Sequence, residues 1–297
     1  MNILWEQVLI LLIFVSIGFL LGKIKIVGQE QSRILSALAV YVFLPCLIFK
    51  SFANINKSYL IVHGKDIFIS AIILVVLIFS SHFAAKLFSK KKYEQSIYEY
   101  SLTVANFGFM GYALAKSMFG EQVLSDTVFF AVPLSLYSYS YAYGMLTKRK
   151  FNIKMLLQPS VLAIILGLVV GISGIKMPNM ISQVISTLDA CMSPITMILT
   201  GIVISGYTAR SLFGKRIIYV IVILRLIIIP CLLGLIIKLI YPPVLIPMLL
   251  CYSMPIGMNT IVFPRLVGEN CEIGAGLVCV TTLLSCITIP IVFSLFK

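Results

Sequence analysis

The sequence predicts an all-α polytopic membrane protein with ten transmembrane helices arranged as two inverted five-helix repeats. Three observations indicate this fold: the apolar composition, the spacing of the apolar runs, and a helix-breaking stretch that occurs twice. Of the 297 residues, 60% are hydrophobic and only 11% are charged, whereas about 25% of the residues in soluble domains are charged. A chain of this composition belongs in a bilayer.

Ten apolar runs, each close to the roughly 17 to 25 residues that span a membrane, follow one another along the chain. They cover residues 7–22, 34–53, 67–88, 97–118, 122–146, 159–175, 181–206, 216–240, 244–265 and 272–296. Glu6, rather than basic residues, precedes the first run, and no small-residue cleavage site follows it. We therefore interpret it as a span and not as a signal peptide.

The basic residues predict the orientation of these spans. Fifteen Lys and Arg residues lie in the loops after spans 1, 3, 5, 7 and 9, and seven lie on the opposite side. The positive-inside rule places the first set in the cytoplasm and both termini outside the cell membrane. The net charge of +13 is thereby explained without nucleic acid, and membrane lipid is the expected surrounding.

The segment Thr147–Gln158 is the most basic connection near the centre of the chain. It divides the sequence into residues 1–147, a cytoplasmic linker 148–158, and residues 159–297. Five spans lie on each side, and an odd number per half gives the halves opposite orientations in the bilayer. Inverted repeats of this kind are common in secondary transporters.

Span 4 contains the first helix-breaking stretch. Within Ser101–Gly120, an amide and two poor helix formers interrupt the run: Asn106, Gly108 and Gly111. Opened backbone inside a bilayer is tolerated only where protein or a water-filled cavity satisfies it. The alternative is that the small residues only allow a neighbouring helix to pack closely.

Span 9 repeats the pattern 148 residues later (268 − 120), where Gly268–Glu269 corresponds to Gly120–Glu121. Its middle contains Pro255, Gly257 and the amide Asn259. Two broken spans at matching places in two halves are a better indication of a binding site than one break. Prolines at matching places in spans 2 and 7 give weaker support.

Several motifs together resemble the auxin efflux carrier family of bacteria and plants. They are FLPCLIF in span 2, ANFGFMGYALAKSMFG in span 4, QPSVLAIILGL in span 6, and MPIGMNTIVFPRLVGEN with TTLLSCITIP in spans 9 and 10. The resemblance implies a fold similar to that of the bile acid sodium symporters, with spans 4 and 9 unwound where they cross at mid-membrane. It also implies substrate binding at the crossing, an elevator-like movement and, by analogy, a homodimer.

The residues at the crossing are the candidate substrate site. The helix halves that follow the breaks direct partial positive charge into a shared cavity, which favours an organic carboxylate. Asn106 and Asn259 can donate and accept hydrogen bonds to substrate, or they can serve only to satisfy the broken backbone. Thr103 and Ser253 are weaker candidates because hydroxyls in membrane helices often bond to a preceding carbonyl.

Two charged residues lie inside apolar spans and could form a buried ion pair. Asp189 and Arg225 are roughly 12 and 14 Å from opposite membrane faces at 1.5 Å per residue, so they could meet in one hairpin. Such a pair would be either structural or involved in coupling. Glu269 is expected to pair with Arg265 at the cytoplasmic surface, and additional cavity candidates are Thr281, Thr282, Tyr137, Tyr139, Tyr141 and Tyr143.

These patterns predict a secondary active transporter of a small organic anion, driven by the membrane potential or by protons. A sodium-coupled symporter of a larger anion is an alternative, disfavoured because MPIGMN contains no acidic residue. A sensor or scaffold that binds without transport is a second alternative, disfavoured by the short loops. No HExxH, P-loop, GxSxG or dinucleotide motif occurs, so we expect no enzyme, metal or cofactor.

Overall fold

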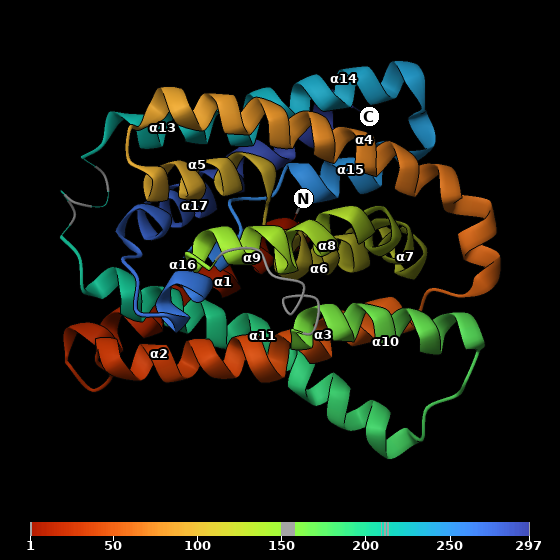
Figure 1. Cartoon of the computed structure of the whole chain (residues 1–297), viewed down its shortest axis with the longest axis horizontal. Coiled ribbons are helices and arrows are strands. Elements are labelled where there is room, and N and C mark those ends of the chain that lie inside the picture. Colours follow the sequence, from red (N-terminus) through yellow and green to blue (C-terminus); the bar gives the residue numbers. More distant parts are fainter. Residues whose placement is uncertain (1, 150–157, 209, 211, 213, 297) are drawn as a thin grey trace.

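The computed structural model describes residues 2–149, 158–208, 210, 212 and 214–296. Within these ranges the regular structure is helical, apart from one isolated antiparallel bridge. Most helices run along the long axis of the molecule (Figure 1). Five helical stretches of the described chain are long and apolar enough to cross a membrane: Glu30–Ala53, Ile61–Phe88, Asn179–Ser205, Arg216–Ile240 and Glu272–Leu295. The sequence-based expectation of a polytopic all-α membrane protein agrees with this architecture.

The first half begins with α1 (Asn2–Lys23). The remaining elements of this half are α2 (Gln29–Leu38), η1 (Ala39–Phe43), α3 (Leu44–Ala53), α4 (Lys57–Phe88), α5 (Lys92–Thr103), η2 (Phe107–Gly111), α6 (Tyr112–Leu114), η3 (Ala115–Phe119), α7 (Glu121–Phe130), α8 (Val132–Tyr139) and α9 (Tyr141–Leu146). The elements η1, η2 and η3 are π-helical turns inside or between α-helices.

The second half begins with α10 (Pro159–Ser173). It continues with α11 (Asn179–Ser205), α13 (Arg216–Ile223), η5 (Leu224–Ile228), α14 (Ile229–Ile240), η6 (Pro242–Val244), α15 (Leu245–Tyr252), α16 (Asn259–Leu266) and α17 (Glu272–Leu295). The described residues of the ten predicted apolar runs are mostly helical, and the runs 97–118 and 244–265 are interrupted at residues 104–106 and 253–258.

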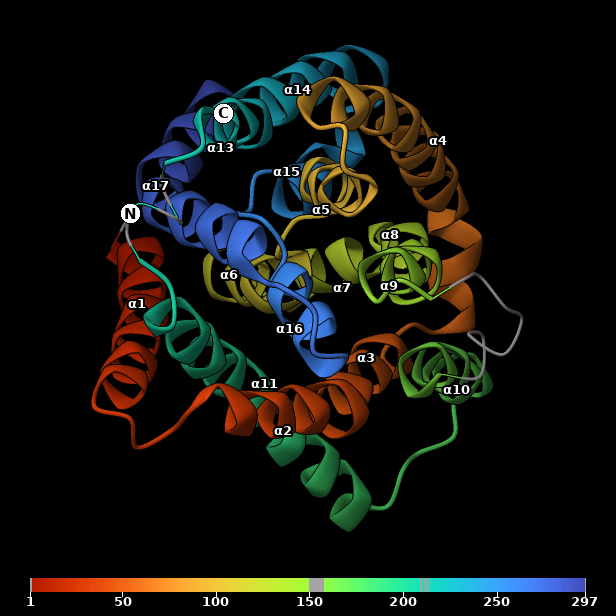
Figure 2. The same ribbon diagram turned by 60° about the vertical axis from the view of Figure 1, so that its left-hand side comes forward.

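The helices form two groups, and Figure 2 shows α1, α2, α3, α10 and α11 together along one side of the molecule. We call α1, α2, α3, α10 and α11 the wall; in it α1 packs on α11 and α3 packs on α10. We call the remaining helices, α4 to α9 and α13 to α17, the bundle. The broken stretches α5–η2 and α15–α16 both belong to the bundle.

Glycines bring the wall helices into backbone contact. A Cβ atom on Gly18 would lie 2.0 Å from the carbonyl oxygen of Ile198, and one on Gly201 would lie 2.0 Å from that of Val15. No side chain fits at such a distance, so α1 and α11 pack backbone against backbone. Small residues have this role in membrane helices generally, where van der Waals packing replaces the hydrophobic driving force.

The same arrangement occurs between α10 and α3. Cβ atoms on Gly167 and Gly171 would lie 2.8 Å and 2.4 Å from the carbonyl oxygens of Phe49 and Ile55. Gly167 follows Gly18 by 149 positions (167 − 18), and Gly171 follows Gly22 by the same number. The first helix of each half therefore packs through a Gly-x-x-x-Gly motif on the second helix of the other half.

The loops that follow spans 1, 3, 5, 7 and 9 meet at one end of the molecule, which we call the basic end. Lys215 Nζ lies 3.4 Å from Glu94 Oε1, which joins the loops after spans 3 and 7. Lys148 Nζ lies 2.6 Å from Glu269 Oε2, which joins the loops after spans 5 and 9. Arg33 Nε donates to the Leu266 carbonyl at 3.1 Å, and Lys148 Nζ lies 4.4 Å from the centre of the Tyr93 ring, so the described parts of all five connections meet at this end.

The expected pair between Glu269 and Arg265 is wrong. Arg265 Nε donates to the hydroxyl of Ser32 on α2 at 2.5 Å, and Glu269 accepts from Lys148 instead. The cause is Gly268, whose positive φ of 77° turns the chain after α16. Gly120 has a φ of 88° at the corresponding place, so the Gly-Glu pairs do end both stretches as predicted.

Candidate functional site

The two broken helices meet at their breaks. Helix α5 ends at Thr103 and α15 ends at Tyr252, and an isolated antiparallel bridge joins Ala105 to Ile256. In this bridge the Asn106 N–H donates to the Pro255 carbonyl at 2.8 Å. The Gly257 N–H donates to the Val104 carbonyl at 3.4 Å. Each break thereby satisfies part of the backbone that the other leaves open, as a bilayer requires.

The residues that form the first break differ in one respect from those expected from the sequence. Gly108 and Gly111 lie in the π-turn η2 and not in the break, which consists of Val104 to Asn106. The chain leaves the helix because Val104 is extended, with φ −115° and ψ 123°. Gly111 instead allows close approach of α15, since a Cβ atom there would lie 2.7 Å from the Leu250 carbonyl oxygen.

Both predicted amides are buried beside the breaks. Asn106 is 3% exposed and Asn259 is 6% exposed. The Oδ1 atom of each has no hydrogen-bond partner among the described residues, while Asn259 Nδ2 donates to the Tyr100 hydroxyl at 2.9 Å. An unpaired buried polar atom costs about 1–3 kcal/mol. Rotating an amide exchanges its oxygen and nitrogen, so each position can offer a ligand either an acceptor or a donor.

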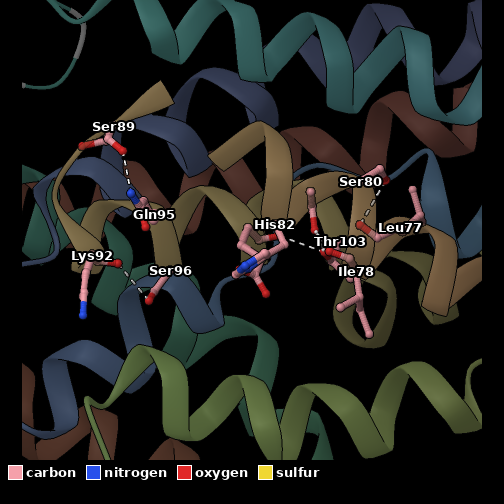
Figure 3. A network of polar contacts seen from close by, with 11 residues as sticks. Leu77, Ile78, Ser80, His82, Ser89, Lys92, Gln95, Ser96 and Thr103 are labelled. Carbon is pink, nitrogen blue, oxygen red and sulfur yellow. Dashed lines mark hydrogen bonds and ion pairs between the residues drawn. The ribbon is translucent and has the colours of Figure 1, made fainter. Parts of the chain in front are cut away.

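The hydroxyls near the breaks have different surroundings. Thr103 donates to the Glu99 carbonyl at 2.8 Å and lies 2.8 Å from the Ser81 hydroxyl, so it faces α4 and not the break (Figure 3). Ser253 has a buried hydroxyl that makes no hydrogen bond to any residue that the structure describes. Thr281, one of the additional cavity candidates, accepts from the Ile256 N–H at 3.2 Å and so supports the second break.

A further polar pair lies near Thr103 and was missed in the sequence. His82 Nδ1 on α4 lies 2.8 Å from Glu99 Oε2 on α5, and Glu99 is 5% exposed. Ser81, next to His82 in α4, lies 2.8 Å from the hydroxyl of Thr103, the last residue of α5. Glu99 falls near the start of an apolar run, where a carboxylate is ordinarily expected at the membrane surface. The structure buries it because α4 and α5 pack along each other.

The predicted pair of Asp189 with Arg225 is wrong. Asp189 Oδ2 lies 2.6 Å from Lys50 Nζ, which joins α11 to α3 within the wall. Arg225 lies in the bundle, is 0% exposed, and donates from Nη1 to the Leu102 carbonyl at 3.3 Å. The prediction assumed that consecutive spans form a packed hairpin. Instead α11 packs on α1, α2 and α3, and the helix that carries Arg225 packs on α17 and α15.

Of the pockets between the wall and the bundle, two lie towards opposite ends of the molecule. At the basic end a pocket of about 830 Å³ is lined by Arg33 and Tyr41 of the wall and by Arg149 and Leu266 of the bundle. At the opposite end a pocket of about 320 Å³ is lined by Lys50, Ser193 and Asp189 of the wall and by Gly108 and Tyr112 of the bundle. Both volumes fall in the range of small-molecule sites.

A comparison with family models matches this chain twice. A model described as membrane transport protein covers residues 3–152 and then residues 145–293. The chain belongs to the membrane transport protein family. The resemblance to the auxin efflux carriers that the motifs indicated is thereby confirmed.

Curated members of the family show the same relationship at low identity. An uncharacterized transporter of Escherichia coli, YfdV, is 21% identical over 182 residues, which cover 57% of this chain and 58% of the relative. An uncharacterized transporter of Methanocaldococcus jannaschii is 25% identical over 211 residues, which cover 67% and 68%. A Methanothermobacter thermautotrophicus transporter is 28% identical over 129 residues, which cover 42% and 41%. The match to the E. coli relative thus spans less than two thirds of its length.

Proposed function

We propose that this member of the membrane transport protein family is a secondary active transporter that carries a small organic anion, a carboxylate, across the cell membrane. The observation that carries the proposal is the bridge between the two breaks. Beside it the buried amides Asn106 and Asn259 each have an oxygen that no described residue bonds. Polar atoms left unpaired at such a place are available to a ligand.

The chemical class of the ligand follows from the helix ends. After each break a new helical stretch begins, at Phe107 and at Asn259. The N–H groups of a first helical turn have no partner within the helix and carry partial positive charge. Together with the rotatable amides they favour a carboxylate over a cation.

Two features support a topology of ten spans in two inverted repeats with both termini outside. The Gly-x-x-x-Gly motifs of α1 and α10, 149 positions apart, make equivalent contacts with the other half. The basic loops after odd-numbered spans meet at one end, joined by Lys215–Glu94 and Lys148–Glu269. Positive loops on a single side are expected for a cytoplasmic face.

The two pockets support alternating access. They open towards opposite ends between the same two bodies, so sliding of the bundle along the wall would enlarge one and reduce the other. In this elevator-like scheme the wall is stationary and the bundle carries the crossing. Because the sequence contains no ATP-binding motif, the membrane potential or a proton gradient would supply the energy.

Counterflow of radiolabelled carboxylates in proteoliposomes tests the proposal. The double variant Asn106→Ala with Asn259→Ala should lose at least about tenfold in the initial exchange rate, the range expected when buried polar contacts to a ligand are removed. Asn179→Ala, which removes an exposed amide at the start of α11, serves as the matched control and should retain the rate.

Three outcomes would contradict the proposal. An unchanged rate in the double variant would exclude the crossing as the site. Uptake that requires a sodium gradient would favour a sodium symporter. Carboxylates that raise the thermal midpoint of the purified protein without any counterflow would favour a sensor.

A further inference from the structure

Arg225 is the largest side chain that the bundle buries completely. It is 0% exposed and belongs to η5, in the middle of the helical stretch Arg216–Ile240. No carboxylate forms an ion pair with it in the described part of the chain. Buried charges in proteins are ordinarily paired, and charges in membrane spans ordinarily mark a functional site. The positive charge of this guanidinium must therefore be balanced by groups other than a described carboxylate.

The guanidinium lies at the ends of both helices that stop at the crossing. Its Nη1 donates to the carbonyl of Leu102, the penultimate residue of α5, at 3.3 Å. Its Cζ lies 5.8 Å from the centre of the ring of Tyr252, the last residue of α15. Its Nε and Nη2 atoms are buried and have no partner among the described residues. One side chain thus contacts both half-helices on the side where they end.

The end of a helix attracts a cation. The last four carbonyl groups have no partner within the helix, and the aligned peptide dipoles give this end about half a negative charge. Arg225 donates to a terminal carbonyl of α5 and lies over the ring of the last residue of α15. In transporters with discontinuous helices, these carbonyls and helix ends are the groups that coordinate a coupling sodium ion or proton.

The local sequence explains how the side chain reaches this place. Pro230 follows at the start of α14 and has no N–H to donate to the carbonyl four residues earlier. A π-turn compensates, with the Ile229 N–H donating to the Leu224 carbonyl. Such single π-turns displace the side chains they contain and are frequent at functional sites. Arg225 is the second residue of this turn.

We propose that Arg225 is a built-in cation that occupies the place of a coupling sodium ion at the crossing. It neutralises the ends of α5 and α15 permanently, because a guanidinium does not release its proton in proteins. The protein consequently needs no sodium ion to hold the crossing together. This inference rests on the proposed function for its role in transport, but the neutralisation itself is a property of the protein without substrate.

Thermal unfolding of the purified full-length protein tests the neutralisation directly. Midpoints are measured in choline chloride, in sodium chloride at equal ionic strength, and with millimolar guanidinium added to choline chloride. The wild-type midpoint should be the same in all three. Arg225→Ala should unfold at least about 5 °C lower in choline chloride, and sodium or guanidinium should restore a large part of that loss.

The matched control is Lys50→Ala, which removes a cation from the pocket-lining pair with Asp189. Neither sodium nor guanidinium should restore the midpoint of this variant selectively. The carboxylate that remains, that of Asp189, is partly exposed and is not a helix end. If Arg225→Ala does not fold, Arg225→Lys and Arg225→Gln take its place. The lysine variant should not respond to sodium, and the glutamine variant should be stabilised by it.

Transport gives an independent measurement. Counterflow by Arg225→Gln should increase severalfold with sodium, whereas wild-type counterflow should not respond. Two results would overturn the inference: stabilisation of the wild type by sodium, or the same midpoint for the uncharged variants in all three media. A carboxylate that stabilises the wild type but not Arg225→Lys would also overturn it, since Arg225 would then bind the substrate itself. The thermal midpoints measured without added carboxylate do not depend on transport. A failure of the proposed transport function can therefore be distinguished from a failure of this inference.

Discussion

The wall and the bundle differ in the contacts by which their helices pack within a membrane. In the wall, glycines such as Gly18 and Gly201 place backbone against backbone. All buried side-chain polar atoms without a partner among the described residues lie in the bundle, including those of Asn106, Arg225 and Asn259. Dense apolar packing gives a single stable arrangement, whereas unpaired polar groups are tolerated where a ligand or a movement uses them. The comparison predicts that the wall determines stability and the bundle determines transport.

The largest expected effect is in the wall. Gly201→Val would place a Cβ atom 2.0 Å from the Val15 carbonyl oxygen and 2.5 Å from the Phe19 nitrogen. Since neither backbone atom can move without separating α1 from α11, we expect no folded protein by size-exclusion chromatography in detergent. The control is Gly64→Ala in α4, where the added Cβ atom would have no atom of the described chain within 4 Å. It should stabilise the protein by about 0.5–1 kcal/mol. Normal folding of the valine variant would refute backbone contact in the wall.

A smaller effect is expected from the same kind of substitution in the bundle. Gly111→Ala brings a Cβ atom to 2.7 Å from the Leu250 carbonyl oxygen, and Gly257→Ala brings one to 3.2 Å from that of Ala105. The first should reduce stability by about 1–3 kcal/mol and the second by less, because overpacking depends on how far neighbours must shift. Thermal midpoints measure stability, and counterflow should decrease in both variants. Equal thermal midpoints for the two variants would show that the distance from the added Cβ atom to the carbonyl oxygen does not determine the loss of stability.

The ion pair between Lys50 and Asp189 should contribute less than the glycine contacts. Its side chains are 42% and 22% exposed, and partly exposed pairs contribute about 0.2–1 kcal/mol, less at high salt. A double-mutant cycle with Lys50→Ala and Asp189→Asn should give a coupling energy in this range. The same cycle on Lys116 and Glu121, which are 62% and 70% exposed, should give a value near zero.

The smallest effect concerns the basic end and depends on pH. Burial raises the pKa of Glu94, but the Ser89 hydroxyl and the charges of Lys215 and Lys91 lower it by more, so that it lies below its ordinary value of 4.5. A carboxyl with a lowered pKa stabilises the folded state above its unfolded pKa, and this contribution disappears as the pH falls through the folded pKa.

The variant Glu94→Gln should therefore be less stable than the wild type by under about 1 kcal/mol at neutral pH. The difference should vanish as the pH decreases below 4.5. Glu6→Gln, at an exposed position of α1, is the control and should show no such convergence. A difference that grows in acid would mean that the contacts of Glu94 do not favour its charged form.

The sequence predicts features that depend on residues close together in the chain. The first break is predicted from Asn106, Gly108 and Gly111 and the second from Pro255 and Gly257, although Gly108 and Gly111 lie in η2 beyond the break. The common location of the basic loops is predicted from the distribution of Lys and Arg among the loops. The contacts of Asp189 and Arg225 could not be predicted. They depend on which helices pack together, and here the wall combines helices from both halves. The Gly-x-x-x-Gly motif of α1 and α10 is visible in the sequence, but the helices against which it packs can be identified only from the structure.

The bridge between Ala105 and Ile256 also constrains how the protein is made. Its two residues lie on opposite sides of the linker 148–158 in the sequence, and a ribosome completes the first long before the second. Until residues 253–258 are inserted, the N–H of Asn106 lacks the Pro255 carbonyl that receives it. Neither half alone can therefore satisfy its own broken helix. The two halves expressed as separate chains should accumulate in the membrane only when both are present in the same cell.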